Sequence, residues 1–383
     1  MIEYNFPTTI LFGENSIKEL PKRIENLALK NCLIVTDSGL IKIGIAEKIT
    51  SIFENANLDF TIFSNVHPNP IKGDVIQGVQ FYKDNNCDGI IALGGGSPMD
   101  VAKTIRFMSV HEFPLEQYDD EKGGDRLIIN PMPPLFAIPT TAGTGSEVGR
   151  CSVITLDSTG KKTIFFHPGL MPNIAVLDPN LTLDLPKHIS AATGMDAFTH
   201  CFEAFMVSEF HPMADAIAIK GMELIVENLP LVIENGLNIN ARGQMLLSAT
   251  MGATAFQKGL GMTHSMAHPL SAEFGLHHGL ANALCLPPCV RLIELKIEHN
   301  PELKNKLKMV SKLFSKKLGN ENLSQSIQNF IENIGIKMGL KNYHIDDTHI
   351  EKLSQLALED SCHKTHPFKV KKEDFINCFK ESL

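Results

Sequence analysis

The chain has 383 residues, of which 43% are hydrophobic and 20% are charged, proportions typical of a globular protein with enough residues for two domains. Its formal net charge of −8 argues against a surface for nucleic acid or anionic membranes, because such surfaces need clustered lysine and arginine. No basic segment followed by an apolar run opens the chain, and no uncharged apolar stretch reaches the roughly 18 to 20 residues of a membrane span. We therefore expect neither a signal peptide nor a transmembrane helix.

In the first half of the chain, short apolar runs alternate with helical patterns. The predicted strands are Thr8–Phe12, Cys32–Thr36, Phe60–Phe63, Asp88–Leu93, Leu135–Pro139, Ser152–Leu156 and Ile174–Leu177. Helices are predicted at about 16–27, 41–53 and 70–85. This alternation is the signature of a parallel α/β sheet.

The alternation ends after Asp178-Pro179, and from Lys187 onward the apolar residues follow a helical period. We therefore predict two domains: an α/β domain over residues 1–180 and an all-helical domain over residues 181–383. The eight cysteines include no CxxC pair, and isolated cysteines in apolar surroundings are typical of reduced core thiols. Reduced thiols in turn indicate a cytoplasmic protein.

Three consecutive glycines follow the apolar run that ends at Leu93, in the segment Gly94–Asp100. Glycines let a backbone approach a phosphate closely, and the N-terminus of the following helix favours an anion. Ser97 is expected to cap that helix or to donate its hydroxyl to phosphate. The alternative is a tight turn that binds nothing. The segment is not the usual GxGxxG pattern, because Met99 holds the place of the third glycine.

A second turn, Ile138–Glu147, also follows a buried strand, and its hydroxyls and glycines could line a nucleotide's ribose, phosphates and nicotinamide. The alternative is a capped loop in which a helix begins at Ser146. Because open parallel sheets bind ligands at the carboxyl ends of their strands, both turns are expected at one edge. Asp37 ends another strand there. Its carboxylate could accept hydrogen bonds from an adenosine ribose and repel a 2′-phosphate, which favours NAD over NADP, although a capping role is the alternative.

Histidines are concentrated in the second half, where seven of the fifteen lie between His188 and His278. Asp196 and His200 are four residues apart, as are His264 and His268, so each pair shares one face of a helix. His278 follows a turn that contains glycine. Imidazole and carboxylate ligands suit Fe²⁺ or Zn²⁺. The alternative for any one of these histidines is a structural or exposed side chain.

Taken together and in this order, these segments resemble the iron-containing (group III) alcohol dehydrogenases over nearly the whole chain. The matching segments are Gly94–Asp100, Pro139–Val148, Gly194–Ala197 with His200, His264–Pro269, and His278-Gly279. The resemblance implies the dehydroquinate synthase-like fold of that family: an N-terminal dinucleotide-binding α/β domain, an all-helical C-terminal domain, and an active site in the cleft between them.

The resemblance also implies roles for single residues. The expected metal ligands are Asp196, His200, His264 and His278, with His268 beside the metal and the substrate as the catalytic residue. The expected cofactor contacts are Asp37, Gly95, Gly96, Ser97, Asp100, Thr140, Thr141, Thr144 and Lys162.

Two departures from the family pattern stand out. His277 occupies the position before the last ligand, where proline is common, so His278 has a neighbouring competitor. Near the C-terminus, many relatives have Asn-Pro-Arg after Asp-x-Cys, whereas this chain has His363 and a His366-Pro367-Phe368 segment after Asp360-Ser361-Cys362. This second change puts the choice of substrate in doubt.

The expected reaction is hydride transfer between a primary alcohol or diol, or the corresponding aldehyde, and NAD(H), with the substrate oxygen bound to Fe²⁺ or Zn²⁺. His268 is expected to relay the released proton. The alternatives are a glycerol-type polyol dehydrogenase, a dehydroquinate-synthase-like lyase and, more remotely, a non-catalytic protein that binds metal and nucleotide. A small-molecule substrate and a homodimer formed through the N-terminal strand are expected.

Overall fold

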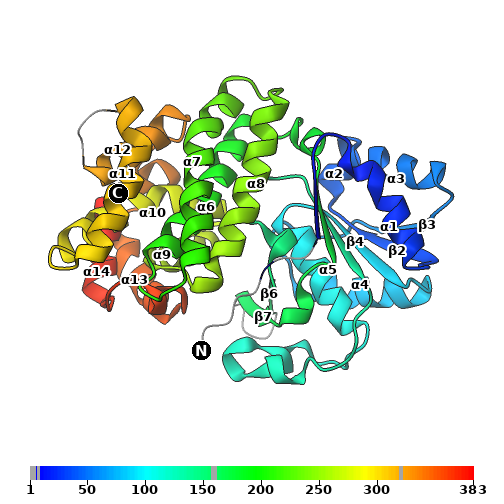
Figure 1. The fold of residues 1–383 in the computed structure, drawn as a ribbon. Helices are drawn as coiled ribbons and strands as arrows, with labels where there is room; N and C mark the ends of the chain where they lie inside the picture. Colours follow the sequence, from blue (N-terminus) through cyan, green and yellow to red (C-terminus); the bar gives the residue numbers. More distant parts are fainter. Residues whose placement is uncertain (1–5, 7–8, 157–161, 319–321) are drawn as a thin grey trace. The chain divides into compact units, whose positions relative to one another are not determined.

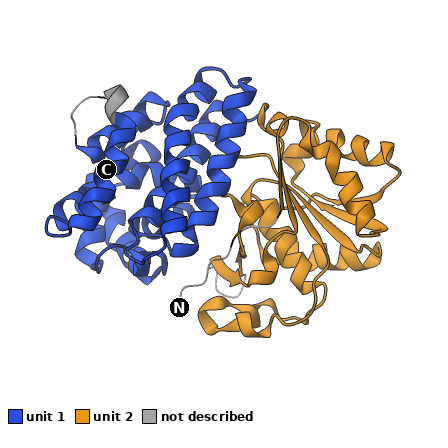
Figure 2. Cartoon of the chain, in the orientation of Figure 1, with its two compact units in different colours: residues 1–5, 142–144, 184–383 blue, residues 6–141, 145–183 orange. Residues whose placement is uncertain are grey.

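The computed structural model describes residues 6, 9–156, 162–318 and 322–383. Thr8, the first residue of a predicted strand, lies outside this part. The chain divides into an α/β unit (residues 6–141 and 145–183) and a helical unit (residues 1–5, 142–144 and 184–383), shown in Figure 2. The predicted fold class, a parallel α/β region followed by an all-helical region, is confirmed.

The α/β unit is built around a parallel sheet with the strand order β1-β8-β5-β4-β2-β3. Its strands are β1 (Thr9–Phe12), β2 (Asn31–Val35), β3 (Asp59–Phe63), β4 (Gly89–Gly94), β5 (Leu135–Pro139) and β8 (Ile174–Leu177). Its α-helices are α1 (Leu20–Asn26), α2 (Ser38–Lys42), α3 (Ile45–Asn55), α4 (Lys72–Asp84) and α5 (Gly96–Met108). Figure 1 shows these helices around the sheet.

Alternate residues of each central strand pack on opposite faces of the sheet. Leu33 and Val35 of β2 belong to a core that includes residues of α4 and α5. Cys32 and Ile34 belong to a second core with residues of α1 and α3. Because both faces are covered, the central strands are apolar throughout, which explains the continuous runs in the sequence.

One predicted strand lies outside the parallel sheet. The run predicted at Ser152–Leu156 forms β6 (Cys151–Thr155), which pairs with β7 (Lys162–Phe166) in an antiparallel ribbon. The burial of β6 alternates between buried and partly buried residues, as expected for a ribbon packed on one face.

The helical unit is organised around α6 (Lys187–Met206), in which every residue from Ser190 to Met206 is buried. The other α-helices are α7 (Pro212–Glu234), α8 (Ile239–Ala255), α9 (Met262–Phe274), α10 (His278–Lys296), α11 (Pro301–Leu318), α12 (Leu323–Asn333), α13 (Ile350–Glu359) and α14 (Lys372–Glu381). Helices α7, α8, α9 and α10 all pack against α6. A helix enclosed on all sides is apolar all round, so the polar residues on α6 need a specific cause. Among the described residues, no helix is both long and apolar enough to cross a membrane.

Candidate active site

The two glycine-containing turns lie side by side at one edge of the sheet. Strands β4 and β5 pair in register, with Gly94 opposite Pro139, so the segments that follow them leave the sheet together. The backbone N–H of Thr140 donates to the carbonyl oxygen of Gly94 at 3.1 Å. Strand β2 is the other neighbour of β4, and Asp37 follows its end. Three neighbouring strands therefore bring the predicted nucleotide residues to one edge, as parallel strands do.

The first turn needs glycine for a steric reason. Gly94 has φ +146°, and a Cβ atom there would lie 2.7 Å from Cγ of Pro98. Gly95 is the N-cap of α5, and Ser97 lies inside the helix. The Ser97 hydroxyl donates to the carbonyl oxygen of Pro68 at 2.7 Å. The prediction that Ser97 caps the helix is therefore wrong, because α5 begins two residues earlier than a Ser97 cap would require.

Asp100 makes hydrogen bonds within the protein. Its carboxylate accepts from the Ser146 hydroxyl at 3.1 Å and from the backbone N–H of Val153 at 3.2 Å. Burial raises the pKa of Asp100 to about 6, although Lys103 acts in the opposite direction. Lys162 begins β7, is exposed, and is close enough to contribute a smaller lowering of the same pKa. These bonds join α5 to the second turn and to the β6–β7 ribbon, and the expected cofactor contacts of Asp100 and Lys162 stay predictions.

Asp37 caps α2 (Ser38–Lys42). Its Oδ1 accepts from the backbone N–H groups of Gly39 at 2.8 Å and Leu40 at 3.0 Å. The alternative interpretation of Asp37 as a capping residue therefore describes its contacts. Because capping occupies Oδ1, the ribose contact stays a prediction for the same carboxylate.

The threonines of the second turn divide between the two units. Thr140 is buried and Thr141 packs against Gly95, where a Cβ atom would lie 3.2 Å from Oγ1 of Thr141. Residues 142–144, which include Thr144, belong to the helical unit. There Gly143 packs so closely against α6 that a Cβ atom would lie 2.8 Å from Cβ of Thr193.

The predicted metal ligands converge inside the helical unit. Asp196 and His200 come from α6, His264 from α9, and His278 is the first residue of α10. Ligand atoms of Asp196, His200 and His264 all lie within 4.8 Å of one another, and all three side chains are buried. Nε2 of His278 lies 3.5 Å from Oδ1 of Asp196, and Nε2 of His264 lies 3.9 Å from the same oxygen.

The adjacent histidines 277 and 278 have different surroundings. His277 is exposed and precedes α10, whereas His278 faces Asp196. Gly279 permits this placement, because a Cβ atom there would lie 2.1 Å from the carbonyl oxygen of Ala192 on α6. Only glycine lets the start of α10 approach α6 so closely.

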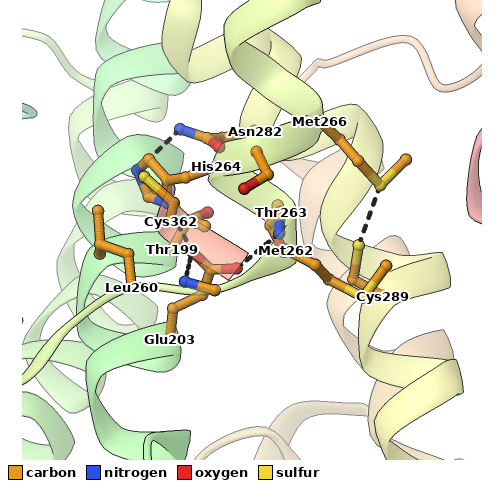
Figure 3. A network of polar contacts seen from close by, with 12 residues as sticks. Thr199, Glu203, Leu260, Met262, Thr263, His264, Met266, Asn282, Cys289 and Cys362 are labelled. Atoms are coloured by element: carbon orange, nitrogen blue, oxygen red, sulfur yellow. Dashed lines mark hydrogen bonds and ion pairs between the residues drawn. The ribbon is translucent and has the colours of Figure 1, made fainter. Parts of the chain in front are cut away.

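A buried carboxylate fixes the orientation of His264. Oε2 of Glu203 lies 2.6 Å from Nδ1 of His264, and Glu203 also accepts from the backbone N–H groups of Gly261 at 3.0 Å and Thr263 at 2.7 Å. Figure 3 shows Glu203 on one side of His264 and Asn282 on the other. With Nδ1 held by the carboxylate, Nε2 of His264 is the nitrogen that faces Asp196. Carboxylates orient metal-binding histidines in this way in many proteins.

Asn282 lies among the proposed ligand atoms. Its Nδ2 donates to Oδ1 of Asp196 at 2.8 Å and lies 3.2 Å from Nε2 of His278 and 3.3 Å from Nε2 of His264. Its Oδ1 is buried and has no hydrogen-bond partner. One amide thus contacts three separate ligand side chains.

The electrostatics of this cluster suit a cation. Burial alone would raise the pKa of Asp196, but His200, His278 and His264 outweigh it and hold this pKa at about 2. Burial lowers the pKa of His200 to about 4 and that of His278 well below its usual value. The carboxylate is therefore ionised and these two imidazoles are neutral near pH 7, the forms that bind metals. The oxygen and nitrogen donors fit Fe²⁺ or Zn²⁺.

His268 belongs to a neighbouring network. Its Nδ1 lies 2.7 Å from Oδ2 of Asp360, and its ring stacks on His278 with centroids 5.3 Å apart. Oδ1 of Asp360 accepts from the Ser265 hydroxyl at 2.7 Å and from the backbone N–H of Cys362 at 2.8 Å. Asp360 therefore fixes the ring of His268, as the carboxylate does in other Asp–His pairs.

Sequence reasoning missed three of these residues, namely Glu203, Asn282 and Asp360. Helical spacing could have indicated two of them, because Glu203 lies one turn beyond His200 and Asn282 one turn beyond His278. Asp360 was recognised only as part of a C-terminal motif. Of the histidines that depart from that motif, His366 is buried and its Nδ1 accepts from the backbone N–H of Met262 at 3.4 Å. His363 packs its ring on Phe375, with centroids 5.5 Å apart.

The fold and the two clusters define an oxidoreductase of the type that combines a dinucleotide-binding sheet with a metal site in a helical region. Residues 7–179 match the family model of iron-containing alcohol dehydrogenases, and residues 190–383 match the model of that family's C-terminal domain. The chain belongs to the iron-containing alcohol dehydrogenase family. This membership confirms the predicted enzyme class and the two predicted cofactors, NAD(H) and iron.

Individual relatives match the chain over nearly its whole length or all of it. A 4-hydroxybutyrate dehydrogenase from Cupriavidus necator is 34% identical over 377 residues, which are 97% of each protein. The structure of a 1,3-propanediol oxidoreductase is similar with a TM-score of 0.92 at 33% identity and covers 100% of both chains. A sulfoacetaldehyde reductase from Bifidobacterium kashiwanohense, solved in complex with NAD⁺, has a TM-score of 0.88 at 25% identity and covers 100% of this chain and 98% of that chain.

Proposed function

We propose that Asp196, His200, His264 and His278 hold the metal ion of an NAD(H)-dependent dehydrogenase that interconverts a primary alcohol or diol with its aldehyde. The observation that carries this proposal is the convergence of one carboxylate and three imidazoles from three helices, with Glu203 orienting His264. When bound, the metal supplies Lewis-acid polarisation of the substrate oxygen.

The side chains of the protein have separate tasks in this reaction. Asp196 offers a full negative charge that offsets the charge of the cation, and His200 and His278 add neutral imidazoles to the ligand set. The turns after β4 and β5, with Asp37, hold the dinucleotide at the edge of the sheet, which supports NAD as the cofactor.

His268 is proposed to accept the proton that leaves the alcohol. Because Asp360 engages its Nδ1, Nε2 is the nitrogen that exchanges a proton. Histidine is the side chain that enzymes use most often as a general acid or base. Asp360 is a positioning residue for this step, since it holds the ring and stabilises its charged form.

The names of the relatives suggest a substrate class. They include dehydrogenases for an ω-hydroxy acid and for a short diol, so a short aldehyde with a polar group at its far end is the proposed substrate. A cytoplasmic location is proposed as well, and it is supported by the eight cysteines, all of them described, none of which forms a disulfide. A homodimer is proposed through β1, which is an edge strand with Phe12 exposed, because such edges readily pair with a second copy.

The test combines metal analysis with turnover. Protein purified without oxygen is assayed for NADH oxidation over aldehydes of different length and charge, and its iron and zinc are measured. His264→Ala is expected to lose both metal and turnover, and His268→Ala to keep the metal but lose about 100-fold in rate with an altered pH profile. Full metal content and activity in His264→Ala would refute the ligand assignment, and an unchanged rate in His268→Ala would refute the proton transfer.

A further inference from the structure

Beside the proposed catalytic ligands lies a second group of metal-binding side chains. A ring nitrogen of His268, a carboxylate oxygen of Asp360 and Sγ of Cys362 all lie within 4.8 Å of one another. His268 comes from α9, Asp360 follows α13, and Cys362 begins the short helix η11 (Cys362–Thr365). All three are partly buried, so an ion from solution can reach them.

The backbone around these residues is fixed by hydrogen bonds. Asp360 accepts from the Ser265 hydroxyl and from the backbone N–H of Cys362, and the Ser265 hydroxyl in turn accepts from the backbone N–H of His363 at 2.9 Å. These bonds hold the start of η11 against α9. Three donors from separate elements are thereby brought together before any ion binds, which reduces the conformational cost of binding.

The donors select the kind of ion. A thiolate, an imidazole and a carboxylate form a typical zinc ligand set, and a thiolate is a poor ligand for Mg²⁺ or Ca²⁺. The two negative charges of Cys362 and Asp360 neutralise a divalent ion, which limits its repulsion by a cation held at Asp196. Zinc donors at about 2.0 to 2.3 Å from the ion lie within roughly 4 Å of one another, so donors spread over as much as 4.8 Å need only a small approach when the ion binds.

We infer that His268, Asp360 and Cys362 form a second metal site, which takes Zn²⁺ and inhibits the enzyme. The ion binds Nδ1 of His268 in place of the proton shared with Oδ2 of Asp360, that proton moves to Nε2 of His268, and the Cys362 thiol releases its proton to solvent. His268 can then no longer exchange a proton. The inhibitory effect rests on the proposed function, whereas the existence of the site does not.

Sulfur allows the two sites to be told apart. The four proposed catalytic ligands contain no sulfur, so a thiolate-to-metal charge-transfer absorption that depends on Cys362 reports the second site. Full-length protein is titrated with Co²⁺ without oxygen, and the near-ultraviolet absorption is recorded. The wild type is expected to develop the band, and Cys362→Ser and Cys362→Ala to lose it. Cys151→Ser is the matched control, because Cys151 is the other cysteine that is only partly buried. This variant is expected to keep the band.

A second measurement tests the effect on turnover. NADH oxidation is followed at increasing Zn²⁺ after the catalytic metal has been loaded, and each variant is compared with its own uninhibited rate. The Zn²⁺ concentration for half inhibition is expected to rise more than about 10-fold in Cys362→Ser, since even indirect partners of a metal contribute that much affinity.

The results separate the two proposals. Absence of the band in the wild type, or its persistence in both Cys362 variants, overturns the second site. A band that depends on Cys362 in a protein without dehydrogenase activity supports the site and refutes the proposed function. Equal inhibition of the wild type and Cys362→Ser overturns the inhibitory role.

Discussion

Oε2 of Glu203 and Nδ1 of His264 lie 2.6 Å apart, and both side chains are almost completely buried. Burial alone would lower the pKa of His264, but the hydrogen bond and charge of Glu203 outweigh it and raise this pKa overall. One carboxylate therefore fixes both the orientation of the ring and the nitrogen that carries its proton.

Replacing Glu203 should weaken metal binding without removing a ligand. Glu203→Gln removes the negative charge, so we expect the metal affinity to fall about 10- to 100-fold, as for other carboxylates that orient ligand histidines. Metal retention during dialysis against graded chelator measures this change. Glu209→Gln, an exposed glutamate just after α6, is the control. Equal retention in both variants would contradict the role given to Glu203.

The two adjacent histidines should differ sharply. His278→Ala removes a proposed ligand and should lower metal content and turnover by at least about 100-fold, whereas His277→Ala removes an exposed side chain and should change either by less than about 2-fold. Metal analysis and NADH oxidation on the two purified proteins make the comparison. The reverse ranking would assign the ligand to His277.

Charge and capping can be separated at Asp37. Asp37→Asn keeps an oxygen that can cap α2 but removes the charge, so we expect the NAD preference over NADP to fall on the order of 10-fold with stability unchanged. Asp37→Gly should relax the preference equally and cost a few tenths of a kcal/mol in stability. The ratio of kcat/KM for the two cofactors and a urea melt report the two effects. An unchanged ratio in both variants would remove Asp37 from cofactor selection.

His366 should make the protein sensitive to acid. Burial lowers its pKa to about 4, against 6.5 as the ordinary value. Between these values the unfolded chain binds more protons, so the free energy of unfolding falls as the pH is lowered from 6.5 to 4, by up to about 3 kcal/mol. His366→Asn should flatten this part of the curve, which denaturant melts at pH 7 and pH 4 measure. Parallel curves for the two proteins would contradict the assignment.

Residues that repeat along one helix were predictable from the sequence. The four-residue spacing of Asp196 and His200 places both on one face of α6, and this placement does not depend on how the helix packs against the rest of the chain. Strands β4 and β5 were also predictable from the sequence, because buried strands of a parallel sheet are continuously apolar. Contacts between residues far apart in the chain could not be predicted in this way. Asp360 and His268 are separated by more than ninety residues, and no local sequence pattern encodes their contact.

The errors have local causes. The N-cap of α5 is Gly95, whose backbone is extended. Ser97 therefore lies within the first turn of the helix and not at its cap. The run at Ser152–Leu156 has the composition of a strand, but composition does not determine which strand it pairs with. Its partner β7 begins at Lys162, an expected cofactor contact, and the neighbouring Lys161 lies outside the described residues.

Gly279 lies against the carbonyl oxygen of Ala192, and this contact constrains the order in which the proposed metal ligands come together during folding. The first turn of α10 reaches Asp196 only after α6 and α10 have packed together, and His264 adds the same requirement for α9. If Asp196, His264 and His278 hold the iron as proposed, a freshly synthesised chain must complete most of its helical region before it can bind iron with high affinity. Iron supply would then affect the lifetime of the folded enzyme more than the yield of folding, since a ligand that binds only the native state slows its loss.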